Sequence, residues 1–164
     1  MDLDLGPLIS LKQKNRVLSF YENAEQDGIS ILAKGSISDN VSKTGFFVSP
    51  ILLGPVPTDN TLAKEEIFGP CLSVIPFSNE NEAISIANGT QYGLTAGIWT
   101  NDGSKQLRVA NALKCGQVFI NCYGAGGGVE LPFGGMKKSG FGREKGMEGL
   151  KELTVCKTIV QKFN

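Results

Sequence analysis

Three features of the sequence could take part in chemistry: four cysteines, a pair of adjacent glutamates and a long glycine-rich segment. The cysteines form no C-x-x-C pair, so their spacing predicts neither a zinc site nor a disulfide framework. Histidine is absent, which excludes histidine-dependent dyads, catalytic triads and H-E-x-x-H zinc chemistry within the chain. We therefore expect no metal site, and we expect ordinary reduced thiols at Cys71, Cys115, Cys122 and Cys156.

Charged residues supply two further candidates, and each has an ordinary explanation. Glu65 and Glu66 are neighbours, and adjacent side chains of an extended segment point to opposite sides. They are therefore not expected to work as an acid–base pair at one site. The cations Lys137, Lys138 and Arg143 fit either an anion site or a solvated surface, and the surface is the commoner outcome.

The glycine-rich segment, residues 121–146, holds nine of the 21 glycines. A loop this long inside a compact domain is usually functional or disordered, and its aromatic residues favour function. It is not a phosphate loop, because neither G-x-G-x-x-G at a strand-to-helix turn nor G-x-x-x-x-G-K-[ST] occurs. Two interpretations stay open: a wall of a ligand pocket, or a structural loop that packs against another domain.

The elements that must position these residues can be read from caps and periodicity. Ser10 with Gln13 predicts the start of a helix that Gly28 ends, and a short strand is expected over residues 29–33. Residues 46–48 resemble another short strand. Pro50 and the glycine and prolines that follow it predict a surface loop.

From Cys71 onward the pattern becomes regular. Strands are expected at residues 71–77, 95–100 and 117–121, with helices between them that begin near Asn79 and near Asn101 or Asp102. This order predicts an α/β fold with a parallel βαβαβ sheet and right-handed crossovers. Ligands of such sheets lie at the carboxyl ends of the strands. The segment from Cys122 to Gly142 leaves the third strand at that edge.

Two motifs resemble the aldehyde dehydrogenase superfamily. They are AKEEIFGP at residues 63–70 and LPFGGMKKSGFGRE at residues 131–144, and the YGL at 92–94 and LTVCKTIV near the end follow in the same order. The resemblance covers nearly the whole chain from Gly6. It implies part of a Rossmann-like catalytic domain over residues 1–151, followed by an oligomerisation strand over residues 152–164.

The resemblance implies oxidation of an aldehyde to a carboxylic acid with NAD or NADP. Glu66 would accept hydrogen bonds from the nicotinamide-side ribose, because a carboxylate can accept from two vicinal hydroxyls. Phe68 would pack beside that ribose and the nicotinamide. Cys122, Tyr123 and Phe133 would lie in the substrate pocket.

The sequence departs from the family pattern in one respect. The family's nucleophilic cysteine and glutamate base precede the region matched here, so no catalytic residue is assigned and Cys122 is taken as an ordinary thiol. We expect an inactive truncated fragment of such an enzyme. The alternatives are a non-catalytic scaffold that associates with full-length subunits and an independent nucleotide-binding module that uses Glu66 and Phe68.

The composition and the C-terminal tail indicate which partners to expect. The net charge is zero, so no basic excess points to nucleic acid or an anionic membrane, and no apolar run is long enough to span a bilayer. A cytoplasmic protein is expected. The β-branched tail at residues 153–163 predicts association as a homo-oligomer or with related subunits. The alternative is an edge strand that folds back on its own domain.

Overall fold

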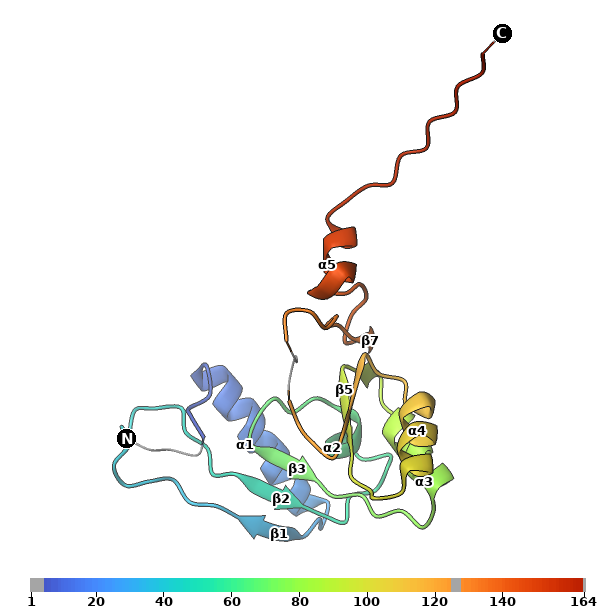
Figure 1. Cartoon of the computed structure of the whole chain (residues 1–164). Helices are drawn as coiled ribbons and strands as arrows, with labels where there is room; N and C mark the ends of the chain where they lie inside the picture. Colours follow the sequence, from blue (N-terminus) through green and yellow to red (C-terminus); the bar gives the residue numbers. More distant parts are fainter. Residues whose placement is uncertain (1–4, 125–127, 164) are drawn as a thin grey trace. The chain divides into compact units, whose positions relative to one another are not determined.

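The computed structural model describes residues 5–124 and 128–163, so residues 125–127 of the glycine-rich segment and both chain ends lie outside it. The chain divides into two compact units, residues 1–78 and 79–164, and each is described by itself. Figure 1 labels their helices and strands. Among the helices of the described ranges, none combines the length and apolar character that a membrane span requires.

The first unit begins with helix α1 (Leu11–Gln26). Its start is the one predicted, because the Ser10 side chain accepts a hydrogen bond from the Gln13 N–H at 3.2 Å. Gly28 follows the helix at φ +71°, a conformation that ends helices at low steric cost for glycine. The expected helix is therefore confirmed at both ends.

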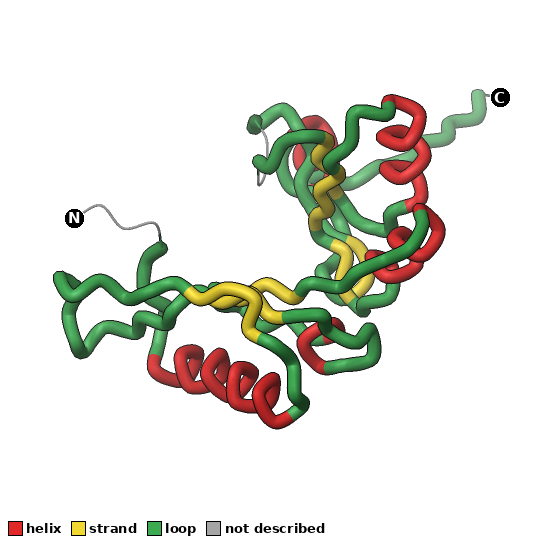
Figure 2. Tube along the Cα trace, turned by 90° about the horizontal axis from the view of Figure 1, so that it is seen from below, coloured by secondary structure: helices red, strands yellow, loops and turns green. Residues whose placement is uncertain are grey.

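Helix α1 lies along one face of a three-stranded sheet (Figure 2). The sheet order is β1–β2–β3, with β1 and β2 antiparallel and β2 and β3 parallel. Val17 of α1 and Leu53 of β2 are almost completely buried at the centre of the core. The strands are β1 (Ile31–Lys34), β2 (Ile51–Leu53) and β3 (Cys71–Ser73), and the short helix α2 (Thr61–Lys64) precedes β3.

Two expectations for this unit are wrong. Residues 46–48 form no strand, and the central strand β2 lies where a surface loop was expected after Pro50. The Ile51 N–H donates to the Pro70 carbonyl at 2.9 Å, so the pairing depends on a segment distant in sequence. Three residues flanked by prolines give too short a pattern to identify as a strand from the sequence.

The second unit contains two helices whose caps were predicted. Asn79 caps α3 (Glu80–Asn88) by accepting from the Glu82 N–H at 3.0 Å. Asp102 caps α4 (Gly103–Ala112) by accepting from two backbone N–H groups, and these bonds lower the pKa of its carboxyl. The helices are joined by a bidentate ion pair in which Arg108 contacts Glu80 at 3.0 and 2.9 Å.

Helix α4 connects the parallel strands β5 (Thr95–Ile98) and β6 (Gln117–Ile120). Strand β4 (Tyr92–Gly93) pairs antiparallel with β7 (Met136–Lys137). The expected parallel sheet of three successive strands is wrong in one pairing, because β3 hydrogen-bonds to β2. The local crossover from β5 to β6 was predictable, whereas the long-range partner of β3 was not.

Helix α5 (Gly146–Glu152) precedes the tail. Residues 153–163 are extended and exposed, and within the described residues they form no strand (Figure 1). The expected C-terminal strand is therefore not formed by the single chain. Large apolar side chains remain exposed along this tail: Leu153, Val155, Ile159, Val160 and Phe163.

Candidate functional site

The first unit holds one candidate site, the loop at residues 66–70 between α2 and β3. Ile67 is buried in the core of the first unit, whereas Glu66 and Phe68 on either side of it are exposed. Phe68 has an exposed fraction of 72%. Burial of Ile67 therefore fixes the loop to the core, and the loop presents a carboxylate and an aromatic ring to solvent.

The backbone of this loop is strained at Phe68, which has φ +59°. For a residue with a Cβ, the left-handed conformation costs roughly 1–2 kcal/mol. Such strain persists only where surrounding contacts determine it, and it is common at ligand sites. The contacts that hold Phe68 must therefore contribute at least this much.

Helix α1 supplies those contacts. The Gln13 side-chain amide Nε2 donates to the Ile67 carbonyl at 3.0 Å and to the Phe68 carbonyl at 2.9 Å. The Arg16 guanidinium Nη1 donates to the Ile67 carbonyl at 3.1 Å. At about 0.5–1.5 kcal/mol net for each hydrogen bond, the three together contribute about 1.5–4.5 kcal/mol, which is comparable to or larger than the backbone strain.

Close packing supports the same contact. A Cβ on Gly69 would lie 2.5 Å from Cγ2 of the fully buried Val17, so glycine lets the loop approach α1. The Tyr21 hydroxyl lies 3.2 Å from the Ser49 carbonyl and 3.3 Å from the Pro70 carbonyl, and it can donate to either. Burial raises the pKa of Tyr21 to about 12, so the hydroxyl keeps its proton over the physiological range.

The exposed side chains of this loop combine hydrogen-bond acceptors with an apolar surface. Within the described residues the Glu66 carboxylate makes no hydrogen bond or ion pair, so both oxygens can accept from hydroxyls. The exposed Phe68 ring offers a flat apolar surface beside it. Glu65 has extended backbone angles, φ −101° and ψ 148°, which turn its side chain away from that of Glu66 as expected.

The second unit holds a separate group of candidate residues, which follows strand β6. Asn121 has φ +53°, and its side chain accepts from the Thr100 N–H at 2.9 Å and donates to the Thr100 carbonyl at 3.0 Å. This pair joins the carboxyl ends of β5 and β6. Cys122 and Tyr123 come next and are exposed, and the Tyr123 ring lies 6.2 Å from that of Phe119.

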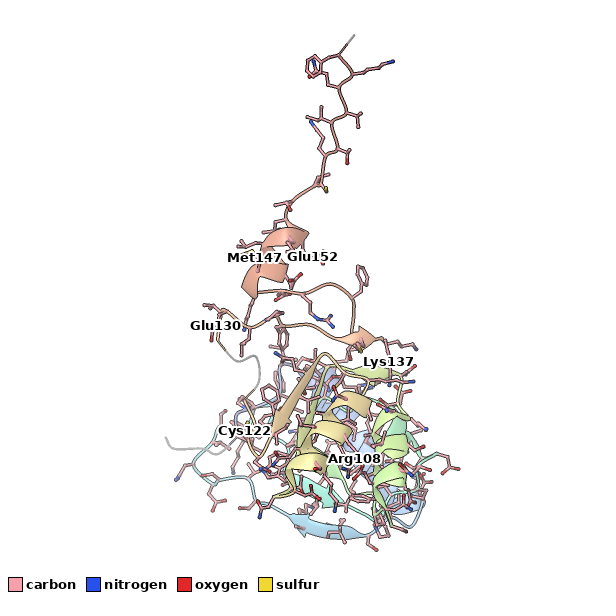
Figure 3. All side chains as sticks on the ribbon, turned by 45° about the vertical axis from the view of Figure 1, so that its right-hand side comes forward. Arg108, Cys122, Glu130, Lys137, Met147 and Glu152 are labelled. Atoms are coloured by element: carbon pink, nitrogen blue, oxygen red, sulfur yellow. The ribbon has the colours of Figure 1, made fainter. Side chains whose placement is uncertain are left out.

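Phe133 lies elsewhere in the second unit. Its backbone pairs with Glu144 through two 2.7 Å hydrogen bonds, and Gly134 beside it is in close contact with Gly116, just before β6. Cys122, by contrast, follows the end of β6, away from Lys137 (Figure 3). Phe133 borders a hollow of about 330 Å³ with Arg143 and Glu152, and neither Cys122 nor Tyr123 lines it. Cys122 and Tyr123 are neighbours in the sequence, and the structure places Phe133 at a different position, beside the residues that precede β6.

The cations of the glycine-rich segment bind the chain's own carbonyls. Arg143 Nη1 donates to the Gly135 carbonyl at 2.9 Å and the Gly142 carbonyl at 2.6 Å. Lys137 Nζ donates at 3.0 Å to the carbonyls of Asn88 and Thr90, near the carboxyl end of α3. These contacts assign both side chains to holding the loop in shape.

The cysteines differ in environment. Cys71 is half-buried, and burial raises the pKa of its thiol to about 11. Burial also raises the pKa of Cys115, whereas Cys122 and Cys156 are exposed. In residues 5–124 and 128–163, no cluster of cysteine and carboxylate side chains could hold a metal ion.

Sequence reasoning missed three residues that shape the site: Gln13, Arg16 and Asn121. Gln13 was assigned to the helix cap, and its N–H does serve there, but its side chain binds the loop. Arg16 and Asn121 received no role. The only local signal was their polarity, because their acceptors lie more than 20 positions away along the chain.

Comparison with known proteins gives consistent matches. The model of the aldehyde dehydrogenase family matches residues 1–159. A betaine aldehyde dehydrogenase of Rhizobium leguminosarum bv. trifolii (strain WSM2304) is 40% identical over 94% of this chain and 32% of its own length. This chain therefore spans about a third of the length of the curated relatives it matches.

Solved structures agree with this match. A protein of Burkholderia cenocepacia, provisionally named an aldehyde dehydrogenase, superposes with TM-score 0.92 and 55% identity over 96% of this chain and 33% of its own. An aldehyde dehydrogenase of Mycobacterium tuberculosis complexed with NAD+ superposes with TM-score 0.83 and 38% identity. The match covers 90% of this chain and 30% of that protein's chain. The α/β fold expected from the motifs is confirmed.

Proposed function

This chain belongs to the aldehyde dehydrogenase family, and on that premise we propose that Glu66 and Phe68 contact the nicotinamide half of a bound NAD. The reaction is the oxidation of an aldehyde to a carboxylic acid. The observation that carries the proposal is the loop at residues 66–70, where an exposed carboxylate and aromatic ring flank a buried anchor. We propose NAD in place of NADP because NAD+ complexes are known for three similar proteins.

When bound, the cofactor supplies the redox chemistry by accepting a hydride from the substrate. Glu66 accepts hydrogen bonds from two neighbouring ribose hydroxyls and so fixes the rotation of the sugar. Phe68 covers one side of the ribose and nicotinamide and excludes water there. Cys122, Tyr123 and Phe133 are proposed as parts of the wall that selects the aldehyde, with Cys122 as an ordinary thiol.

The Glu66 role is tested by Glu66→Gln in a reconstituted complex that includes this chain, or at the matching position of an intact relative. The amide keeps the size but removes the charge and one acceptor, so the sugar is held less firmly. We expect hydride transfer to slow by roughly 100-fold, the cost of a small misplacement of reacting groups. Single-turnover formation of NADH measures this step.

Glu65→Gln is the matched control, because it removes the same charge from the adjacent exposed residue. It should leave hydride transfer within about twofold of the unchanged enzyme if only Glu66 faces the cofactor. If Glu66→Gln changed the melting temperature but not the rate of hydride transfer, Glu66 would be a structural residue. Equal rate losses in both variants would also reject the assignment.

A second function is favoured by the exposed tail. Its five large apolar side chains and extended backbone support a role in association, in which the tail adds a strand to a neighbouring subunit's sheet. The partner is a second copy or a related subunit, and the location is cytoplasmic. Turnover with an aldehyde and NAD by the 164 residues alone distinguishes an enzyme from a scaffold that only associates.

A further inference from the structure

We propose that Trp99, Phe119 and Tyr123 form one aromatic surface that binds the ring of an aromatic aldehyde. The inference rests on the proposed function, in which Tyr123 belongs to the wall that selects the aldehyde, and it names the class of that substrate. It extends the wall from the glycine-rich segment onto the ends of β5 and β6. All three residues belong to the second unit.

The pairing of β5 with β6 places Trp99 and Phe119 on one face of the sheet. Gly97 lies beside Phe119 in the parallel register, and Trp99 follows Gly97 by two positions, which returns its side chain to the same face. A Cβ on Gly97 would lie 2.5 Å from Cζ3 and 2.9 Å from Cη2 of Trp99, so the indole ring lies over bare backbone. The Tyr123 ring continues the surface at 6.2 Å from the Phe119 ring, tilted by 53°.

Exposure distinguishes a binding surface from an ordinary packing device. An aromatic ring over a glycine can serve only to shield the strand, and shielding uses one face of the ring. Trp99 is 64% exposed and Tyr123 is 71% exposed, so their outer faces are open to solvent. Phe119, whose position lies between them, is half-buried. The surface therefore offers ring faces to a ligand while its middle is anchored in the unit.

The position of the rings in the fold supports the same role. Ligands of parallel α/β sheets bind at the carboxyl ends of the strands. Trp99 directly follows β5, and Tyr123 comes three positions after the last residue of β6. The hydrogen bonds between Asn121 and Thr100, at 2.9 and 3.0 Å, join the two strand ends. Because Trp99 and Tyr123 lie within two positions of these joined residues, the bonds also fix the spacing of the rings.

A row of rings on one sheet face suits a planar apolar ligand better than a compact cation. Quaternary ammonium groups are recognised by aromatic cages that surround the charge, whereas this surface contacts a ligand from one side. Asp102, the carboxylate nearest to Trp99 in the sequence, accepts hydrogen bonds from two N–H groups of α4. An aromatic ligand gains offset or edge-to-face contacts with more than one ring. The surface therefore fits aldehydes whose carbonyl is attached to an aromatic ring.

The test uses the fluorescence of Trp99, the only tryptophan of the 164-residue chain. Benzyl alcohol is the probe, because it carries the aromatic ring but no carbonyl that could react with lysines or thiols. It should change the Trp99 emission in a saturable way. Tyr123→Ala should raise the Kd of benzyl alcohol about two- to tenfold, the loss expected for one aromatic contact. Phe119→Leu, which keeps most of the apolar volume, should raise it by less.

Three comparisons control for non-specific binding. Phe141→Ala removes a fully exposed ring elsewhere in the same unit, and it should leave the Kd of benzyl alcohol unchanged. Cyclohexylmethanol has a similar size without an aromatic ring, so it should bind severalfold more weakly. Tetramethylammonium, the probe for a cationic substrate, should leave the emission unchanged. Because Tyr123 is exposed, far-UV circular dichroism of its variant should match that of the unchanged chain.

Several outcomes would overturn the proposal. Emission that does not respond to benzyl alcohol would reject the surface, as would an unchanged Kd in Tyr123→Ala or an equal rise of the Kd in Phe141→Ala. Tighter binding of tetramethylammonium, or equal binding of cyclohexylmethanol, would reject the aromatic class of substrate. None of these measurements needs NAD. A missing effect of Glu66→Gln on hydride transfer would therefore count against the proposed cofactor contact alone.

Discussion

At the scale of single residues, strained backbone marks the family motifs. Four residues other than glycine have positive φ in the described ranges: Phe68, Asn121, Lys137 and Lys145. Phe68, Lys137 and Lys145 lie in or next to the motifs at residues 63–70 and 131–144, and Asn121 directly follows β6. Such positions cost roughly 1–3 kcal/mol and persist where neighbouring contacts enforce them. Side-chain hydrogen bonds do so beside Phe68 and Asn121. Of these four residues, Phe68 is proposed to meet a ligand, and Asn121 directly precedes Cys122 of the proposed pocket wall.

The thiols provide a test at this scale. Burial raises the pKa of Cys71 from 9.0 to about 11, which lowers its thiolate fraction at pH 8 by roughly 100-fold. The half-buried Cys71 should therefore react with a thiol reagent far more slowly than the exposed Cys122. Peptide mapping after timed alkylation measures the two rates. Equal rates at Cys71 and Cys122 would show that the Cys71 environment opens freely.

The same shift predicts a dependence of stability on pH. The pKa of Cys71 is higher in the folded than in the unfolded chain. Its contribution to folding stability is therefore complete below about pH 9 and is lost as the pH rises through about 11. Burial likewise raises the pKa of Tyr21 from 10.0 to about 12, so its contribution to stability is lost as the pH rises through that range. Denaturant midpoints should fall across this window. Cys71→Ala should make the fall between pH 9 and 11 shallower than in the unchanged chain.

At the scale of elements, Asn121 joins the ends of β5 and β6. Asn121→Ala loses both hydrogen bonds to Thr100 and keeps the positive φ, which alanine tolerates less well than asparagine. We expect a loss of roughly 2–4 kcal/mol in unfolding free energy, from about 1 kcal/mol for each bond plus the backbone strain. Chemical denaturation followed by Trp99 fluorescence measures it.

Asn121→Gly separates the two causes of that loss. Glycine loses the same hydrogen bonds but adopts positive φ freely, so it should be less destabilising than alanine by about 1 kcal/mol. A glycine variant as unstable as the alanine variant would remove backbone strain from the explanation. An alanine variant of unchanged stability would contradict the role of the side chain.

Elements whose signals are local were predictable from sequence. The caps at Ser10, Asn79 and Asp102 each bind a backbone N–H two or three positions away, so the short motif contains the whole interaction. Strand β2 and the pairing of β3 depend on partners far along the chain. The motifs identified Glu66 and Phe68, but only the structure gave the helix that holds them.

At the scale of the whole molecule, the tail at residues 153–163 is the feature that suggests association with another chain. Its exposed apolar side chains and unpaired backbone are typical of an edge that other chains extend. We expect the chain to self-associate at tens of micromolar, a proposed range in which apolar burial between tails is already favourable. Light scattering coupled to size-exclusion chromatography measures the molar mass.

Deletion of residues 154–164 should shift the chain toward smaller species. The matched control replaces Lys157 and Lys162 by alanine, which keeps the apolar side chains and should increase association. A monodisperse monomer with the tail present would reject this role. Self-association that survives the deletion would place the contact elsewhere.

The hydrogen bonds from the Gln13 side chain to the loop at residues 66–70 have a consequence for the order of folding. Gln13 and its two acceptors are 54 and 55 positions apart, so their contact closes a long loop at an entropic cost of about 3.5 kcal/mol. Helix α1 can form from local interactions, whereas this long-range contact forms after β2 and β3 have paired. We therefore expect the loop to be the last part of the first unit to reach its native conformation. Pulse-labelled hydrogen exchange should show α1 protected before Cys71, whose N–H bonds the Gly69 carbonyl.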